Sequence, residues 1–260
     1  MITGTRASRD PETTPGRVPP SPAPYSGGMD QVMLIHGWGG SFEATWQRNG
    51  FAALLEDGGK QVIGVDLLGH GEAPKPHEPE AYADLTTRVV EALPDDGSKV
   101  AAIGFSLGAL TLARTAVAHP DRFERIVLAG IGSNVFARDH SGAAKISAGL
   151  DAVLAGEDPA ELDTQVRLFT QYAQQPGNDL QALAAIMRRP PGTDLTPETL
   201  SRVTCPVLVV VGENDTSFPA DDLVAAFPDG RGVNLARTDH FATTDSFAFF
   251  DAALEFVGAI

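Results

Sequence analysis

Short apolar runs recur along the chain and alternate with segments of helical spacing. The runs lie at 31–37, 60–71, 99–106, 124–130, 206–215 and 232–238, and helical patterns lie at 42–59, 79–97, 107–120 and 246–260. Most runs are continuous rather than alternating, which is typical of strands buried on both faces of a parallel sheet. The pattern therefore predicts an α/β protein with a mostly parallel central sheet, helices on both faces and right-handed crossovers.

One long interval, at about 132–204, departs from this alternation. Three segments there have helical spacing and no strand is evident, at 143–156, 160–175 and 179–189. Prolines and a glycine then interrupt the chain at 190–192. We expect a helical cap insertion at 132–204, within an α/β core formed by 29–131 and 205–260.

The first 28 residues hold six prolines and four glycines, a composition that excludes a regular helix or a central strand. We interpret residues 1–28 as a flexible Pro/Gly-rich arm. A partner-binding polyproline segment is the alternative, and we favour the flexible arm.

Composition and charge narrow the function classes. Hydrophobic residues make up 43% of the 260 residues, enough for a substantial core. Acidic residues outnumber basic ones, 34 to 19, and a net charge of −15 disfavours nucleic acid and anionic membranes as partners. No run approaches ~18 apolar residues, and the N-terminus lacks the apolar core of a signal peptide. We expect a cytoplasmic monomer or homodimer that acts on a small molecule.

The stretch "GFSLG" at 104–108 places Ser106 between an apolar run and a helical segment. Glycines at both ends of this G-x-S-x-G pattern let a strand turn sharply into a helix, in conformations that Cβ atoms would crowd. Such a turn exposes the Ser106 hydroxyl above the sheet and beside a helix N-terminus, where the dipole favours negative charge. The context indicates a nucleophile rather than an incidental serine.

A serine hydroxyl needs a base, and His240 is the best placed of the six histidines. It follows the last apolar run and precedes the final helical segment, so we expect it on a loop at the carboxyl edge of the sheet. The remaining histidines lie in turns, in a Pro-rich loop, at a helix end or in the insertion: His36, His70, His77, His119 and His140.

The base in turn needs a carboxylate that fixes its tautomer. Asp215 comes just after the strongly apolar run "PVLVVVG", and its position preserves the order Ser…Asp…His. Glu213 is the main rival. Asp239 is a weaker one, because adjacent residues rarely orient their side chains toward each other.

Taken in order, these motifs resemble those of the α/β-hydrolase family over most of the chain, from about Gln31 to the C-terminus. The resemblance rests on "HGWGG" (36–40), "DLLGHG" (66–71), "GFSLG" (104–108), "AHPDRFERIVLAG" (118–130), "GEND" (212–215) and "DH" (239–240). Two departures stand out. The Pro-rich arm offers no strands for the antiparallel hairpin with which family members usually begin, and Ala109 stands where many members have glycine.

The resemblance implies a catalytic triad of Ser106, Asp215 and His240, with "HGWGG" as the oxyanion-hole loop. The backbone N–H groups of Trp38 and Leu107 would then bind the developing oxyanion. The loop residues Asp66, Gly69 and His70 match a recurrent family loop, which we interpret as structural. A serine at the nucleophile position is unlike the haloalkane dehalogenase and epoxide hydrolase branches, which use aspartate.

We therefore expect a serine esterase that acts on a small or medium, largely apolar ester through an acyl-enzyme. A lactonase or carbon–carbon bond hydrolase with the same triad, and a small-molecule receptor on the same fold, are the alternatives. No metal or cofactor is implied, because "HGWGG" lacks dinucleotide-binding spacing and the histidines lack metal-ligand spacing.

Several aromatic residues are candidates for the walls of a substrate pocket, although core packing is about as good an explanation for each. They are Trp38, Phe105, Phe136, Phe169, Tyr172, Phe218 and Phe241. No arginine or lysine lies close enough to a motif to predict a carboxylate clamp. Cys205, the single cysteine, precedes an apolar run and is expected to be buried and not catalytic.

Overall fold

The computed structural model describes Met1, residues 30–137 and residues 141–260. The arm proposed at 1–28 and the insertion histidine His140 therefore lie outside the described residues, Met1 excepted. Within the described part of the chain, no helix is both long and apolar enough to cross a membrane.

The sheet has six strands in the order β2-β1-β3-β4-β5-β6, and every neighbouring pair is parallel. The strands are β1 (Gln31–Ile35), β2 (Gln61–Val65), β3 (Val100–Phe105), β4 (Phe123–Ala129), β5 (Val207–Gly212) and β6 (Gly230–Leu235). Each lies within or next to a predicted apolar run, so the α/β class and the parallel sheet are confirmed. The central strands β3 and β5 are buried along their whole length, which explains their unbroken apolar sequence.

Helices cover both faces of the sheet. One face packs against the π-helix η1 (Glu43–Gln47), α1 (Phe51–Asp57) and α9 (Phe247–Phe256), through a buried cluster that includes Trp46, Phe51 and Phe249. The other face packs against α2 (Thr87–Glu91), α3 (Leu107–Ala118) and α8 (Asp221–Ala225), through residues such as Leu112 and Leu223. The short 3-10 turn η5 (Thr243–Asp245) precedes α9.

Two predicted helices are each broken in the structure. The segment 42–59 divides into η1 and α1 because Gly50 adopts a φ of 82° and the Asn49 side chain accepts a hydrogen bond from the Phe51 N–H. The segment 79–97 divides into the 3-10 turn η2 (Pro79–Tyr82) and α2. There the Asp84 carboxylate accepts hydrogen bonds from the backbone and hydroxyl of Thr86, a local turn that competes with helix.

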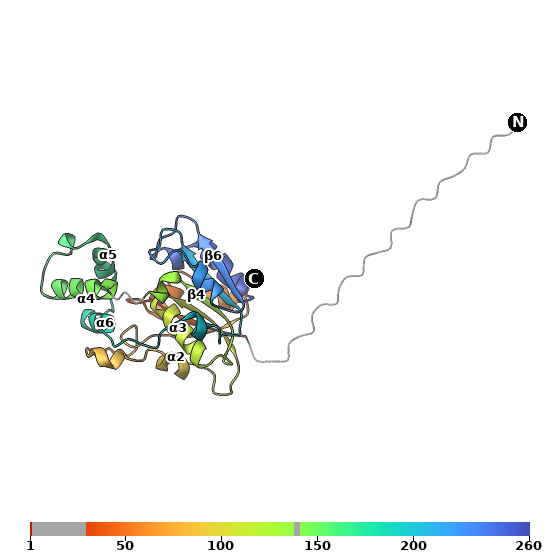
Figure 1. The fold of residues 1–260 in the computed structure, drawn as a ribbon, viewed down its shortest axis with the longest axis horizontal. Helices are drawn as coiled ribbons and strands as arrows, with labels where there is room; N and C mark the ends of the chain where they lie inside the picture. The colour runs from red at the N-terminus through yellow and green to blue at the C-terminus, as the bar shows by residue number, and fades with distance from the viewer. Residues whose placement is uncertain (2–29, 138–140) are drawn as a thin grey trace.

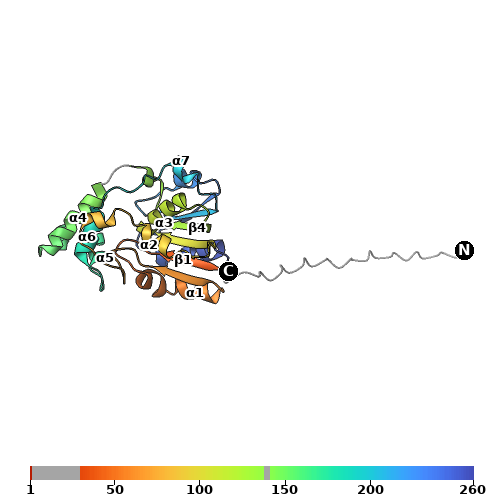
Figure 2. The same cartoon turned by 90° about the horizontal axis from the view of Figure 1, so that it is seen from below.

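The chain between β4 and β5 is helical, as its periodicity predicts. It holds η3 (Ser133–Phe136), α4 (Ser141–Leu154), η4 (Pro159–Glu161), α5 (Thr164–Ala173), α6 (Leu180–Met187) and α7 (Pro197–Leu200). Aspartates cap α5 and α6: Asp163 accepts from the Gln165 N–H at the start of α5, and Asp179 accepts from the Gln181 N–H at the start of α6. Helices α4, α5 and α6 lie together on one side of the sheet (Figure 1), and the view in Figure 2 agrees.

Candidate active site

Ser106 lies at the turn between β3 and α3, in a backbone conformation that is unusual for a residue with a side chain. Its φ is 51° and its ψ is −113°. The flanking glycines permit this turn, because a Cβ on Gly104 would lie 2.7 Å from the Gly108 carbonyl oxygen and one on Gly108 would lie 2.3 Å from the His36 oxygen. Strain of this kind costs on the order of 1–3 kcal/mol, and the buried strand and helix around it hold it in place.

The structure brings Ser106, His240 and Asp215 into one hydrogen-bonded chain. His240 Nε2 lies 3.0 Å from Ser106 Oγ, and His240 Nδ1 lies 2.7 Å from Asp215 Oδ2. Because a carboxylate oxygen only accepts, Nδ1 carries the proton and Nε2 is free to accept from the serine hydroxyl. The three side chains follow β3, β5 and β6, whose carboxyl ends share one edge of the parallel sheet.

Geometry separates Asp215 from its two rivals. The Asp215 side chain is fully buried, and its second oxygen accepts a hydrogen bond from the Ser217 N–H at 2.8 Å. Glu213 is exposed and accepts from the Arg237 N–H, and Asp239 is exposed and accepts from the Ala242 N–H. Only Asp215, of these three carboxylates, contacts His240.

The loop "HGWGG" lies directly against the serine. A Cβ built on Gly37 would lie 3.3 Å from the Ser106 Cβ, so only glycine lets the two backbones approach this closely. Among the described residues, no backbone carbonyl accepts a hydrogen bond from the N–H of Trp38 or of Leu107. Leu107 is the first residue of α3, where N–H groups have no partner within the helix. Both predicted donors therefore lie beside Ser106 with their N–H groups available.

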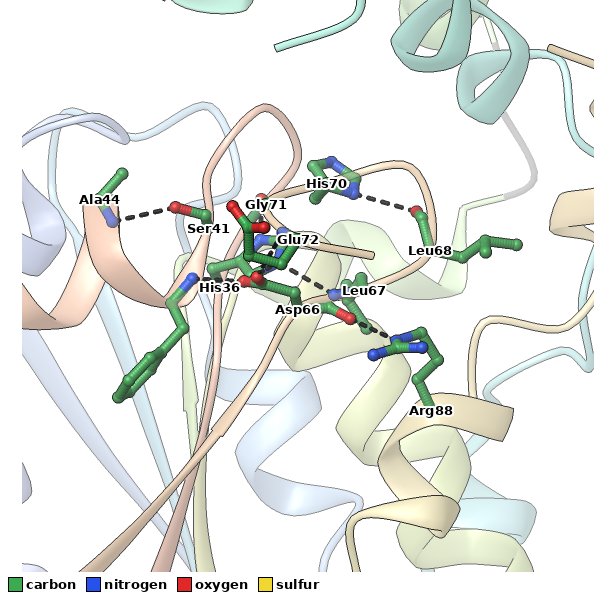
Figure 3. A network of polar contacts seen from close by, with 12 residues as sticks. His36, Ser41, Ala44, Asp66, Leu67, Leu68, His70, Gly71, Glu72 and Arg88 are labelled. Carbon is green, nitrogen blue, oxygen red and sulfur yellow. Dashed lines mark hydrogen bonds and ion pairs between the residues drawn. The ribbon is translucent and has the colours of Figure 1, made fainter. Parts of the chain in front are cut away.

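A network of hydrogen bonds fixes the position of the HGWGG loop (Figure 3). His36 Nδ1 donates to the Gly37 oxygen at 2.7 Å, and His36 Nε2 accepts from the Leu67 N–H at 3.1 Å. The Asp66 carboxylate accepts from the N–H groups of Phe42 and Glu72. These contacts tie the loop after β1 to the loop after β2 through backbone groups, which is a structural role.

His70 and His36 form a buried pair in this network. Their ring centroids are 4.9 Å apart, and both side chains are fully buried. Burial lowers the pKa of His70 well below its usual value, and the neighbouring His36 lowers it further. Burial also lowers the pKa of His36, although Asp66 at 3.7 Å opposes this shift. Both rings are therefore neutral at pH 7.

Aromatic side chains surround His240 on several sides. Phe105 and Phe169 lie with ring centroids 5.1 and 6.1 Å from the imidazole, and Phe241 meets it edge-on at 5.7 Å. Trp38 packs on Phe169 at 5.9 Å, and its indole N–H donates to the Leu183 oxygen of α6. Helices α5 and α6 are thus in direct contact with the loop and the histidine.

A cavity of about 770 Å³ opens at Ser106 and His240. Of the predicted pocket aromatics, Phe169 and Phe241 line it, and Trp38, Phe105 and Tyr172 line a narrow space that also reaches Ser106. Phe136 packs on the core and Phe218 is exposed, and neither lines the cavity. Cys205 is buried outside it, and burial raises the pKa of its thiol to about 11.

Sequence reasoning missed two arginines in the cavity wall, Arg114 and Arg189. A signal for one of them existed: Ser106, Leu110 and Arg114 are spaced four residues apart and so lie on one face of α3. Arg189 follows α6, and no local pattern connects it to the motifs. The sequence placed no basic residue close enough to a motif to predict a carboxylate clamp, and the fold brings these two arginines to the cavity wall.

The comparisons with known proteins agree with this architecture. A family model described as the alpha/beta hydrolase family matches residues 32–257. The chain is 27% identical over 230 residues to a pimeloyl-[acyl-carrier protein] methyl ester esterase of Aeromonas hydrophila, covering 80% of this chain and 87% of the relative. It is 26% identical over 256 residues to a 2-hydroxy-6-oxononadienedioate/2-hydroxy-6-oxononatrienedioate hydrolase of Cupriavidus pinatubonensis, covering 89% and 88%.

A solved structure extends the likeness to three dimensions. The crystal structure of a serine hydrolase involved in carbazole degradation superposes with a TM-score of 0.62 and 26% identity, over 89% of this chain and 92% of that one. The family model spans nearly the whole described fold, from β1 to the end of α9. The chain belongs to the α/β-hydrolase family and is a hydrolase.

Proposed function

We propose that this protein is a serine esterase that cleaves a small or medium, largely apolar carboxylic ester through an acyl-enzyme. The observation that carries the proposal is the chain of two short contacts, 3.0 Å from Ser106 to His240 and 2.7 Å from His240 to Asp215. A nucleophile, a base in the right tautomer and a buried carboxylate that orients the base are the parts that acyl transfer requires.

In the first step His240 Nε2 takes the hydroxyl proton while Ser106 Oγ attacks the ester carbonyl carbon. The carbonyl oxygen becomes an oxyanion, to which the N–H groups of Trp38 and Leu107 donate. Preorganised donors of this kind are worth about 10²–10³ in rate each. Asp215 stabilises the imidazolium that forms and keeps its own negative charge.

The second half of the cycle reverses these roles. Protonated His240 gives its proton to the alkoxide as the carbon–oxygen bond breaks, and an alcohol leaves the acyl-enzyme. His240 then takes a proton from water, whose oxygen attacks the acyl carbon, and the acid is released as Ser106 regains its proton. Neither half requires a group beyond these residues and water.

The cavity wall supports the assignment of a largely apolar substrate. Leu110, Ile131, Val135, Phe169 and Phe241 surround the space next to Ser106. A volume of about 770 Å³ lies within the range of small-molecule sites. The esterase of Aeromonas hydrophila, 27% identical to this chain, supports ester cleavage as the reaction type.

Carbon–carbon bond hydrolysis is the second candidate function. It is favoured by the Cupriavidus pinatubonensis relative, which is named as a hydrolase of a 2-hydroxy-6-oxo-dienedioate and matches 89% of this chain. The same Ser–His–Asp set serves both reactions. Parallel assays with a chromogenic short ester, a lactone and a dienoate diketone distinguish the candidates by the substrate with the highest kcat/KM.

We also propose that the chain divides into a core of 29–131 and 205–260 and a helical cap of 132–204. The contacts of α5 and α6 with the site support a cap that shapes the substrate space: Phe169 lies 6.1 Å from the His240 ring, and Leu183 accepts a hydrogen bond from Trp38. This division assigns the chemistry to the core and the choice of substrate to the cap.

Labelling with a fluorophosphonate probe tests the nucleophile directly. The native chain should be labelled at Ser106, as located by mass spectrometry, and Ser106→Ala should lose the label and hydrolyse 4-nitrophenyl butyrate slower by ~10⁴-fold or more. Ser201→Ala is the matched control, because Ser201 ends the distant helix α7 and should leave both readouts unchanged.

Absence of labelling and of ester hydrolysis in a folded protein would contradict the proposal. Circular dichroism and a cooperative thermal transition establish that each variant is folded. Stabilisation by apolar ligands without product release would then favour a small-molecule receptor on this fold.

A further inference from the structure

Two arginines from different parts of the chain meet in the wall of the cavity that contains Ser106. Arg114 lies on α3, and Arg189 follows the C-terminus of α6. Both arginines are partly buried, and the cavity wall they share with Ser106 includes the apolar side chains of Leu110 and Ile131. Arginines are usually exposed, so two in a partly buried position require an explanation.

The geometry of α3 relates the arginines to the serine. Ser106 precedes the helix, and Leu110 and Arg114 follow at spacings of four residues, so all three line the cavity along one stripe. Eight residues of helix rise about 12 Å between the Cα atoms of Ser106 and Arg114. Side chains on a helix lean toward its N-terminus, which directs Arg114 back toward the serine end.

Each guanidinium is anchored by one backbone carbonyl. Arg114 Nε donates to the Thr193 oxygen at 2.9 Å, and Arg189 Nη1 donates to the Ile186 oxygen at 2.7 Å. A guanidinium has five N–H groups, so these bonds fix its position and leave most of its donors for another acceptor. Within residues 30–137 and 141–260, no carboxylate lies within ion-pair distance of either arginine.

Charges of both signs lie around the two arginines. Burial and the like charge of Arg114 lower the pKa of Arg189 to about 10, so Arg189 is charged at pH 7. Burial lowers the pKa of Arg114, and the negative charge of Asp194 opposes this shift. Asp163 and Asp239 also line the cavity, but each accepts hydrogen bonds from its own loop or helix.

A second cavity, of about 420 Å³, lies on the other side of the same arginines. Asp84 lines it and accepts hydrogen bonds from Thr86, so this carboxylate is engaged locally. The arginines thus form the partition between the two spaces. Only the larger space contains Ser106 and His240.

We infer that Arg114 and Arg189 bind a carboxylate carried by the substrate itself, so that the preferred substrate is the half-ester of a dicarboxylic acid. The ester end lies at Ser106, an apolar chain lies along Leu110, and the free carboxylate lies between the two guanidinium groups. This inference rests on the proposed function and refines its substrate class. A single carboxylate is favoured over a dianion because the chain as a whole carries a charge of −15.

The chemistry balances without a further reactant. Water adds across the ester bond, the alcohol leaves with the proton supplied by His240, and the product is the dicarboxylate. Planar guanidinium groups match the two oxygens of a carboxylate, and a charged hydrogen bond of this kind is worth about 10- to 100-fold in affinity.

A matched pair of esters tests the inference: monomethyl adipate and its neutral isostere, methyl 6-amino-6-oxohexanoate. The native chain should give a kcat/KM at least ~10-fold higher for the half-ester, and Arg189→Gln should reduce this ratio by about 10- to 100-fold. Arg189→Lys keeps the charge and should restore part of the ratio. Half-esters from succinate to suberate then report the distance between the serine and the arginines.

Arg188→Gln is the control, because it removes the same charge from the neighbouring position. Arg188 is exposed and pairs with Asp151 of α4. The Arg188→Gln variant should keep the native ratio of kcat/KM for the half-ester to kcat/KM for the neutral isostere. Equal kcat/KM for the two esters in the native chain, or an unchanged ratio in folded Arg189→Gln, would overturn the inference.

Binding to the Ser106→Ala variant separates this inference from the proposed function. Calorimetric titration of that variant with monomethyl adipate should show binding that the neutral isostere lacks and that a second change, Arg189→Gln, removes. Such binding supports the inference even where the native chain hydrolyses neither ester, a result that would refute only the esterase proposal. Hydrolysis of both esters without selective binding would refute only the inference.

Discussion

The sheet and helix α5 contribute to the same cavity in different ways. β3 and β5 are buried at every residue, and the turns that follow them place Ser106 and Asp215. α5 buries only Val166, Thr170 and Ala173, and it leaves Leu168 exposed at the cavity. A fully buried strand fixes the backbone around it, whereas a helix with one thin buried stripe tolerates change.

The sheet and the helices therefore contribute different parts of the cavity. The carboxyl edge of the sheet holds the reacting groups to within hydrogen-bond distance, which acyl transfer demands. The helices supply walls: Phe169 from α5 and the carbonyl of Leu183 from α6 contact His240 and Trp38. Changes in the sheet should therefore affect all substrates, and changes in α5 should affect some more than others.

The largest expected effect comes from the sheet edge. Asp215→Asn should lower kcat for 4-nitrophenyl butyrate by roughly 10⁴-fold, because an amide can turn its N–H₂ toward His240 and favour the wrong tautomer. Glu213→Gln, two residues away and exposed, is the matched control and should change kcat by less than ~3-fold. Equal losses in the two variants would disprove the choice of Asp215 over its main rival.

A pair of phenylalanines sharpens the comparison of the two regions. Phe249 is fully buried between α9 and the sheet and packs on Phe51, with ring centroids 5.4 Å apart. Phe249→Ala should lower the free energy of unfolding by about 3–5 kcal/mol. Phe169 is half-buried beside His240. Phe169→Ala should cost only about 1 kcal/mol of stability but raise KM for apolar esters roughly 10-fold.

Urea denaturation and ester kinetics on the two phenylalanine variants provide the measurements. Similar losses of stability in both would show that α5 is as tightly integrated as the sheet. A substrate profile unaffected by Phe169→Ala would show that α5 does not shape the cavity in use.

The smallest expected effect is a loss of folding stability at acid pH, and it arises from the buried pair of His36 and His70. Because the pKa of His70 is lowered in the folded state, the unfolded chain takes up a proton first as the pH falls. Stability is therefore complete above about pH 6.5 and decreases below it, with a slope approaching ~1.4 kcal/mol per pH unit for each such histidine. Lys75 and His36 face His70 and both favour its neutral form.

Urea denaturation at pH 7.5, 6.5 and 5.5 should show this loss in the native chain and a smaller one in His70→Gln. His119→Gln removes a histidine outside the pair and serves as the comparison. An unchanged pH slope in folded His70→Gln would show that the buried ring contributes nothing to acid sensitivity.

Local sequence determined the strands, the serine turn and the order of the reacting groups. Apolar runs located the described strands. The runs are continuous in β3 and β5, where burial on both faces leaves no room for polar positions, whereas the edge strands β2 and β6 are partly exposed. The glycines around Ser106 also predicted the serine turn from local sequence, because a Cβ at Gly108 would collide with the His36 oxygen. Breaks such as Gly50 and Asp84 were missed, because helical periodicity of the apolar positions continues across them.

Only the tertiary structure decided between Asp215 and Glu213 and brought the arginines to the cavity. The two acids lie two residues apart with similar local sequence, and the direction of each side chain depends on the loops packed around it. Arg114 and Arg189 are separated by most of the helical segment, and they meet because the chain after α6 returns to α3, where the Thr193 carbonyl accepts a hydrogen bond from Arg114. Periodicity encodes how each element buries its own face, whereas contacts between side chains of distant elements depend on how those elements pack, which no local pattern records.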